Sequence, residues 1–353
     1  MRQYFYELAT DKRNDIVSEF LKVFLWAGSI LYGISLKLVL LSYRAGFFRS
    51  RQLPKPVISI GNITLGGAGK TPLAALLVRL LEEKGLKCAV LARGYGKTAS
   101  EDLNDEGVLL KEQNALIPVF QDNSRFQAGQ EALKNGPVDV FLLDDGFQHW
   151  RLKRNLDIVL IDAQNPFGNG RLIPRGILRE PVSHLKRAGI IVLSKADLNP
   201  GQLENLRRTL RDIAPGALLA EAVHKPLALS DRRNPRAKKD TSFLKGKSIC
   251  AFCAIASPGS FEGLLKRLGA DVQKLFTFMD HYIYNGKDIE NLILFCRQNN
   301  IDTLVTTQKD AVKLKDFMSL FPAGMDIFSL DIQMEIVKGK DELCSRISAI
   351  SSG

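Results

Sequence analysis

The stretch that decides the fold is residues 57–82, which read VISIGNITLGGAGKTPLAALLVRLLE. The apolar run Val57–Ile60 predicts a short buried strand. Residues 72–84 predict a helix, because Pro72 stands in the first turn, leucines recur on one face and Gly85 follows as a stop. A glycine-rich loop between a strand and a helix is typical of a phosphate-binding loop.

The loop itself has the residue types that bind a nucleoside triphosphate. Small residues let backbone N–H groups point at a polyphosphate, and Lys70 can neutralise its β and γ oxygens. The hydroxyl of Thr71 can bind Mg²⁺. Thr64 stands where the usual pattern begins with glycine, but a purely structural turn would not require Lys-Thr at its end. The predicted nucleotide-binding residues are Thr64, Leu65, Gly66, Gly67, Ala68, Gly69, Lys70 and Thr71.

A second motif, Leu142-Leu143-Asp144-Asp145-Gly146, follows the same logic. Two leucines predict the end of a buried strand, and two carboxylates come directly after it. Such acids hold Mg²⁺ beside the phosphates of a nucleotide, directly or through water. The sequence predicts a magnesium site here and leaves open which of Asp144 and Asp145 contacts the ion.

Outward from these motifs, apolar strands alternate with helical segments. Further strands are predicted at 88–91, 138–143, 156–161 and 189–193. Strands that are apolar on both faces indicate an α/β fold, a P-loop NTPase-like parallel sheet sandwiched by helices. A second, smaller α/β lobe is predicted from strands at 248–252 and 303–306 and helices at 259–268 and 310–317. The expected organisation is an N-terminal helical segment at 1–53, a P-loop domain at 54–224, a linker at 225–247 and a C-terminal α/β domain at 248–353.

The N-terminal segment is apolar but short for a transmembrane helix. No charged residue occurs from Val23 to Leu36, a run below the ~20 residues that cross a bilayer. A signal peptide is not expected, because acidic residues precede the run and no cleavage site follows it. One interpretation is a buried core helix. We favour a helix that lies in a membrane interface, because Tyr43, Arg44 and other basic and aromatic residues cluster at its end.

Composition favours an anionic partner. The 49 Lys and Arg residues exceed the 38 Asp and Glu residues and give a net charge of +11. Charge alone leaves open a membrane-associated ATPase that binds nucleic acid. The basic stretch 231–239 has no interleaved aromatic residues for base stacking, so no nucleic-acid partner is expected.

The sequence contains 5 cysteines, an odd number that argues against a set of disulfides. Cys250 and Cys253 stand in a predicted apolar strand, which favours packing in the core over metal or redox chemistry. A reducing cytoplasm fits this use of cysteine.

A P-loop switch GTPase or a partition-type ATPase is the other alternative. Ser194-Lys195-Ala196-Asp197 after a predicted strand is similar to a degenerate guanine-reading NKxD motif. The spacing of Asp144-Asp145-Gly146 does not fit the DxxG motif of such switches. We therefore rank this alternative low.

Several further blocks together resemble one family, the tetraacyldisaccharide 4'-kinases of lipid A synthesis. In the first half they are residues 57–63, Ala92-Arg93-Gly94-Tyr95-Gly96, LDDGFQHW at 143–150, FGNGRLIP at 167–174 and LREP at 178–181. In the second half they are residues 254–258, 280–282 and 306–310. The resemblance runs from the apolar N-terminal helix to near residue 315. The combination is specific, and chance likeness is excluded in practice.

The resemblance implies an ATP-dependent kinase. Such an enzyme transfers the γ-phosphate of ATP to the 4'-hydroxyl of tetraacyldisaccharide 1-phosphate and forms lipid IVA, with Mg²⁺ as cofactor. Its partners are the acylated disaccharide phosphate and the membrane surface, and no obligate protein partner is expected. The expected location is the cytoplasmic face of the inner membrane of a Gram-negative-type bacterium.

The resemblance also implies roles for single residues. Asp105 would accept the proton of the sugar hydroxyl with support from His281, while Lys70 stabilises the moving phosphoryl group. This chain has Asn104-Asp105-Glu106-Gly107 where the family usually has Gly-Asp-Glu-Pro, so the loop can differ in conformation. The implied catalytic residues are Lys70, Asp105 and His281, the metal ligands are Thr71, Asp144, Asp145 and Glu180, and the substrate contacts are Asn62, Arg93, Gln148, His149, Arg171 and Arg179.

Overall fold

The computed structural model of the protein describes residues 2–13, 15–94, 107, 117–198, 200–234, 236–280 and 282–351. The chain forms two compact units. The first contains the described residues within 1–102, 113–223 and 334–353, and the second contains those within 103–112 and 224–333. After the long second-unit stretch that ends at residue 333, the chain returns to the first unit.

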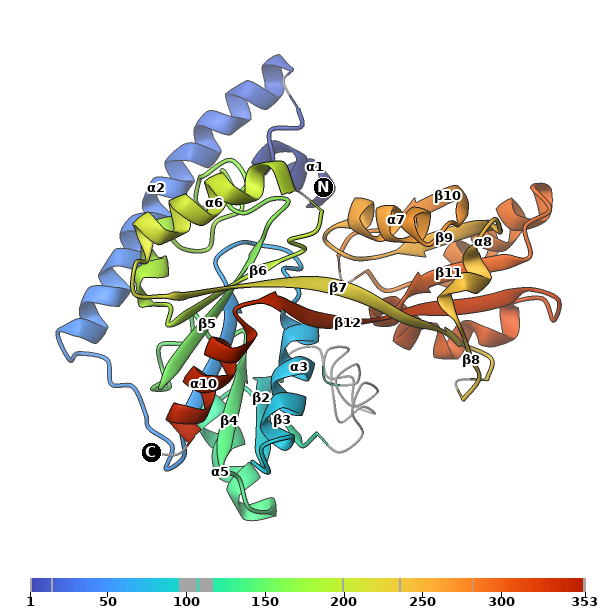
Figure 1. Cartoon of the computed structure of the whole chain (residues 1–353). Coiled ribbons are helices and arrows are strands. Elements are labelled where there is room, and N and C mark those ends of the chain that lie inside the picture. Colours follow the sequence, from blue (N-terminus) through green and yellow to red (C-terminus); the bar gives the residue numbers. More distant parts are fainter. Residues whose placement is uncertain are drawn as a thin grey trace. The chain divides into compact units, whose positions relative to one another are not determined.

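The first unit is built on a parallel sheet, as the sequence predicts (Figure 1). Its strand order is β7-β6-β5-β1-β4-β2-β3, and all six neighbouring pairs in this order are parallel. The apolar runs are buried on both faces, which is why they read as continuous Val, Ile and Leu segments. The strands are β1 (Val57–Asn62), β2 (Cys88–Arg93), β3 (Val119–Asp122), β4 (Val140–Asp144), β5 (Leu156–Asp162), β6 (Ile190–Ser194) and β7 (Leu218–Asp231).

Helices cover this sheet. Helix α3 (Lys70–Glu82) packs on β1, β2 and β4, and α5 (Arg125–Asn135) packs on β2 and β3. Helix α6 (Pro200–Ile213) and the 3₁₀ turn η1 (Val182–Arg187) share one apolar cluster with β5 and β6. Helix α10 (Lys340–Ser351) returns to the first unit, where the Nζ of Lys84 donates to the carbonyl of Cys344 at 3.2 Å.

The carboxyl ends of β1 and β4 approach each other closely. The N–H of Gly146 donates to the carbonyl of Ile60 at 2.9 Å. A Cβ on Gly61 would lie 2.5 Å from the Cβ of Phe147, so only glycine allows this approach. The glycine-rich loop after β1 and the two aspartates after β4 therefore meet at one edge of the sheet, where α/β proteins bind ligands.

The N-terminal helices are α1 (Arg2–Ala9) and α2 (Ile16–Arg44), the long blue helix in Figure 1. Helix α2 buries its small and polar side against residues 172–179. Its Ser29 hydroxyl donates to the carbonyl of Leu172 at 2.8 Å and accepts from the N–H of Arg175 at 2.9 Å. The hydroxyl of Tyr32 donates to the carbonyl of Arg179 at 2.8 Å.

The large apolar side chains of α2 face outward, which inverts the usual pattern of a globular protein. They include Phe20, Val23, Phe24, Leu31, Ile34 and Leu38, all exposed. The helix has 29 residues, more than the uncharged run alone predicts, and by length and composition it could cross a membrane. The exposure of its apolar side chains shows that it is not a buried core helix.

The second unit is a smaller α/β sheet. Strands β9 (Ser248–Cys253), β10 (Asp271–Thr277), β11 (Thr303–Thr307) and β12 (Asp326–Lys338) follow the order β10-β9-β11-β12 in parallel pairs. Helix α7 (Pro258–Arg267) packs in one apolar cluster and α8 (Gly286–Gln298) in another. Short segments α9 (Gln308–Ala311) and η3 (Val312–Leu320) follow β11. Cys250 and Cys253 are buried free thiols in β9, as the apolar strand indicates.

Two segments differ from the expected domain organisation. Residues 225–247 are not a plain linker, because they contain the end of β7, the short strand β8 (Lys238–Lys239) and the turn η2 (Thr241–Leu244). The polar composition of this segment gives no strand pattern for the end of β7, because only some of its side chains, such as Leu229, are buried. Residues 334–351 belong with the first unit rather than with the C-terminal domain.

Candidate functional site

The glycine-rich loop is fixed from two sides. Gly66 and Gly69 have φ values of 107° and 99°, a region that favours glycine. The N–H of Leu65 donates to the carbonyl of Ile177 at 2.7 Å. The hydroxyl of Ser194, at the end of β6, donates to the carbonyl of Ala68 at 2.8 Å. The loop thus leads directly into the N-terminus of α3, whose dipole favours an anion.

Lys70 lies at the first position of α3, between an amide and a carboxylate. Its Nζ donates to Oδ1 of Asn62 at 3.2 Å and lies 3.4 Å from Oδ1 of Asp145. Asn62 is fully buried, and its Nδ2 donates to the carbonyl of Thr64 at 2.8 Å. The carbonyl of Asn62 accepts from Nε2 of Gln148 at 3.0 Å. The structure therefore brings together Asn62, Lys70, Asp145 and Gln148.

Asp145 is held by a second cation, Arg179. The two terminal nitrogens of Arg179 donate to the two carboxylate oxygens at 2.8 and 3.0 Å. Burial raises the pKa of Asp145, but the charges of Lys70 and Arg179 outweigh it and lower the pKa to about 2. The backbone of Asp145 is left-handed, with a φ of 49°, which turns the side chain out of the strand direction. This carboxylate is ionised at neutral pH.

Asp144 is buried at the end of β4, near an arginine that the sequence did not single out. Arg125 of α5 is only 5% exposed. Burial lowers the pKa of Arg125, while the charges of Asp144 and Asp145 act in the opposite direction. One arginine in an amphipathic helix usually indicates a solvated face. The sequence feature that could have pointed to Arg125 is its position directly after β3, at the same edge of the sheet as the other motifs.

Within the described residues, no group of three or more His, Cys, Asp or Glu side chains is arranged to hold a metal ion. Thr71 in the first turn of α3 and the carboxylate of Asp144 offer the hard oxygen ligands that Mg²⁺ prefers. Mg²⁺ commonly binds one or two protein ligands and takes its other ligands from substrate phosphates and water. The residues present fit that kind of site.

Glu180 is fully buried, and its carboxylate is shared by His184 and Arg187. Its carboxylate lies 2.7 Å from Nδ1 of His184 and 3.1 Å from Nη2 of Arg187. Burial raises the pKa of Glu180, but the hydrogen bond from His184 and the charge of Arg187 lower it overall. The guanidinium of Arg187 lies between the rings of Phe147 and Trp150, 4.1 and 4.0 Å from their centroids. A metal-binding role for Glu180 stays a prediction.

His149 lies among cationic side chains. Burial lowers the pKa of His149 to about 4, and Arg125, Arg154, Arg151 and Arg93 act in the same direction. The imidazole of His149 is therefore neutral at physiological pH.

Other predicted site residues are placed as follows in the chain. Arg171 is exposed in the loop that precedes Arg179. Of the three predicted catalytic residues, Asp105 and His281 lie outside the described residues, so their roles stay predictions.

Comparisons with known proteins show which proteins the whole chain resembles. A family profile described as tetraacyldisaccharide-1-P 4'-kinase matches residues 21–351. The chain is 37% identical to a tetraacyldisaccharide 4'-kinase of Syntrophus aciditrophicus, with 87% of each chain covered. It is 34% identical to one of Halothermothrix orenii, with 93% of each covered. It is also similar to a crystal structure of LpxK from Aquifex aeolicus in complex with ATP, with a TM-score of 0.73, 27% identity and coverage of 94% of this chain and 99% of that one.

Proposed function

This chain belongs to the tetraacyldisaccharide 4'-kinase family of lipid A biosynthesis, and on that premise we propose how its residues carry out the reaction. The γ-phosphate of ATP passes to the 4'-hydroxyl of tetraacyldisaccharide 1-phosphate. One observation supports this most directly. Hydrogen bonds and ion pairs connect Lys70, at the N-terminus of α3, to Asn62 and Asp145, and Asp145 to Arg179. A helix N-terminus and a lysine at one point stabilise a phosphoryl group as its charge redistributes.

The general base is a residue other than Asp145. Two cations hold the Asp145 carboxylate, and its pKa of about 2 is far below the value suited to accepting a proton near neutral pH. The resemblance supports Asp105 as the group that accepts the hydroxyl proton and His281 as its partner. Asp145 instead positions Lys70 and Arg179.

Mg²⁺, when bound, neutralises charge on the phosphate oxygens. Thr71 and Asp144 would hold it together with the nucleotide. Of the two acids, Asp144 is the better candidate, because the Asp145 carboxylate is engaged by Lys70 and Arg179. Glu180 is engaged in the same way by His184 and Arg187.

The neutral imidazole of His149 and the cations around it suit a phosphorylated sugar. Arg93 and Arg171 are exposed and are candidate contacts for the disaccharide 1-phosphate. Gln148 and Arg179 are already bonded to Asn62 and Asp145, so they would orient the phosphate-binding residues.

We place α2 in the plane of a membrane interface rather than across the bilayer. Its middle is hydrogen-bonded to polar backbone groups through Ser29 and Tyr32. Close to this side, Arg175 pairs with Asp11 at 2.7 Å. A spanning helix would carry these polar groups into the hydrocarbon region, where each unsatisfied or charged group is unfavourable. An interfacial helix buries only its exposed apolar side, and the acylated substrate lies in the same layer.

The test is transfer of label from γ-labelled ATP to tetraacyldisaccharide 1-phosphate in detergent micelles. The wild type is compared with Lys70→Ala, His281→Ala and a control, Lys55→Ala, at an exposed site. We expect the first two variants to lose most of the transfer rate and the control to keep it. A wild type that hydrolyses ATP but leaves the lipid unlabelled would contradict the proposed acceptor and favour a switch-type ATPase.

A further inference from the structure

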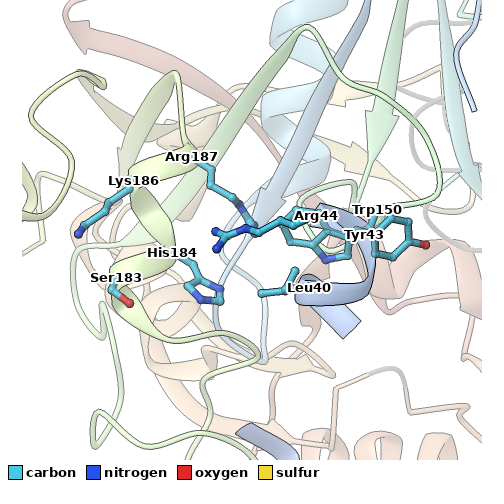
Figure 2. Close-up of a pocket in the computed structure, with 8 residues that line it drawn as sticks. All are labelled: Leu40, Tyr43, Arg44, Trp150, Ser183, His184, Lys186 and Arg187. Carbon is cyan, nitrogen blue, oxygen red and sulfur yellow. The ribbon is translucent and has the colours of Figure 1, made fainter. Parts of the chain in front are cut away.

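A cavity of about 300 Å³ lies between the end of α2 and η1 (Figure 2). Its walls include Leu40, Tyr43 and Arg44 from α2, Trp150 after the DDGFQH motif, and His184 and Arg187 from η1. None of the residues assigned above to nucleotide, metal or substrate lines it. It is a separate site in the first unit.

The cavity carries more positive than negative charge. Within the described residues, the side chains of Arg44 and Lys186, both exposed at this cavity, have no hydrogen bond or ion pair. Arg187 binds Glu180 through Nη2, while its Nε and Nη1 are buried without hydrogen-bond partners there. Figure 2 shows the Arg44 and Arg187 side chains reaching toward one another beside His184. The single negative charge of Glu180, whose carboxylate also contacts His184, does not balance the three cations Arg44, Lys186 and Arg187.

The rest of the wall is apolar and aromatic. The ring centroids of Tyr43 and Trp150 lie 6.4 Å apart, and Leu40 stands one turn before Tyr43 on α2. The exposed apolar side of α2 continues to this point through Leu38 and Leu41. Phe47 and Phe48 follow directly and are also exposed. Tyr, Trp and Arg next to exposed aliphatic residues are typical of the level where lipid headgroups meet acyl chains.

We propose that this cavity binds the phosphate of a membrane lipid whose acyl portion continues along the exposed side of α2. Guanidinium and ammonium groups recognise phosphate oxygens through charge-assisted hydrogen bonds, and the free Nε and Nη1 of Arg187 are further donors. The phosphate comes either from the substrate itself or from a bilayer phospholipid. The inference rests on the proposed membrane association of α2.

The cavity is connected to the phosphate-binding loop through adjacent residues. Arg187 stacks on Phe147, which lies two positions after Asp145. Glu180, which binds Arg187, directly follows Arg179, which binds Asp145. A lipid phosphate that orders Arg187 would therefore stabilise the segments that hold Asp145.

The first arm of the test measures binding without catalysis. Wild type and the double variant Arg44→Gln/Lys186→Gln are sedimented with phosphatidylcholine vesicles that contain or lack phosphatidylglycerol. The control Lys134→Gln/Arg297→Gln removes the same charge at exposed helical sites. We expect the cavity variant to bind the anionic vesicles roughly tenfold more weakly and the control to stay within about twofold. Equal losses in both variants would overturn the site, because they would report net charge alone.

A second variant, Ser183→Trp, fills the cavity and keeps every charge. It is expected to weaken vesicle binding in the same way, and circular dichroism and a melting curve verify that it folds. Unchanged binding by a folded Ser183→Trp protein would also overturn the proposal.

The second arm identifies the lipid. If the substrate phosphate occupies the cavity, the KM for tetraacyldisaccharide 1-phosphate rises about tenfold in non-ionic micelles without phospholipid. If a bilayer phospholipid occupies it, the KM in micelles is unchanged and activity falls only on phosphatidylglycerol vesicles. No change in either assay contradicts both sources. Failure of the proposed kinase activity would appear in the wild type, while the vesicle arm still reports on the cavity.

Discussion

The carboxylate of Asp145 accepts two hydrogen bonds from Arg179, at 2.8 and 3.0 Å, across 34 residues of sequence. The backbone of Arg179 is itself fixed, because its N–H donates to the carbonyl of Ile63 at 2.7 Å and its carbonyl accepts from Tyr32 of α2. One arginine therefore joins the end of β1, the acid after β4 and the N-terminal helix. A displacement of α2 is expected to reach the phosphate-binding loop through this residue.

Arg179→Lys should lower kcat/KM for ATP roughly tenfold. Lysine keeps a charge but loses the two-pronged contact, which is worth about 1–3 kcal/mol. The pKa of Asp145 should also rise, so the acid limb of the pH–rate profile moves upward. Arg208→Lys on the exposed side of α6 is the control. An unchanged profile would show that Asp145 does not depend on Arg179.

Asn62→Ala should weaken ATP binding about tenfold. The change removes the acceptor for Lys70 and the donor to the carbonyl of Thr64, both in a buried position. The free energy of unfolding should fall by about 1–3 kcal/mol as well. Calorimetry on Asn62→Ala, Lys70→Ala and the double variant measures the coupling between them. Strictly additive losses would mean that Asn62 does not act through Lys70.

His149 should make the protein less stable in mild acid. Its folded pKa of about 4 lies below the usual value of 6.5, so the unfolded chain binds more protons between these values. The free energy of unfolding therefore rises with pH across this window. Between pH 7 and pH 5 the wild type should lose about 1–2 kcal/mol from this group. Urea titrations of wild type and His149→Gln at both pH values should show a smaller loss in the variant; equal losses would place the effect elsewhere.

The two sides of α2 should respond differently to substitution. Ser29→Ala leaves the N–H of Arg175 and the carbonyl of Leu172 without their partner and should lower the free energy of unfolding by about 1–3 kcal/mol. Phe24→Ala, at a side chain that is 60% exposed, should change it by at most about 0.5 kcal/mol. Vesicle binding should show the reverse, with Phe24→Ala weaker by about tenfold. Loss of stability in Phe24→Ala would mean that this side packs on protein.

The first sheet could be predicted because its signals are local. The strand before the glycine-rich loop and the helix after it appear as β1 and α3 within a few residues of the expected bounds. Strands β7 and β12 were missed, because charged residues such as Glu221, Lys225, Asp331 and Glu335 interrupt their apolar sequence. Their pairing is set by segments far away in the chain. The last helix, α10, was missed for the same reason. Its few buried residues pack on strands that are far away in the sequence, so the local pattern does not indicate their burial.

The candidate site could be predicted as a set of residues but not as a set of contacts. The motifs name Asn62, Lys70, Asp145 and Arg179, and the structure brings them together. That Arg179 binds Asp145, and that Glu180 is shared by His184 and Arg187, depends on how the loop after β5 folds back on β1. Arg125 carries no motif at all, so only its burial reveals it.

The return of the chain to the first unit also sets the order in which the protein can be completed during translation. Leu343 and Ile347 of α10 are buried there, and a terminal nitrogen of Arg346 donates to the carbonyl of Gly189. These residues leave the ribosome only after the entire second unit has been synthesised. The first unit therefore stays incomplete during synthesis of the second unit, and the part of its core that α10 covers stays exposed. Nascent chains arrested before residue 334 should expose that core to chaperones.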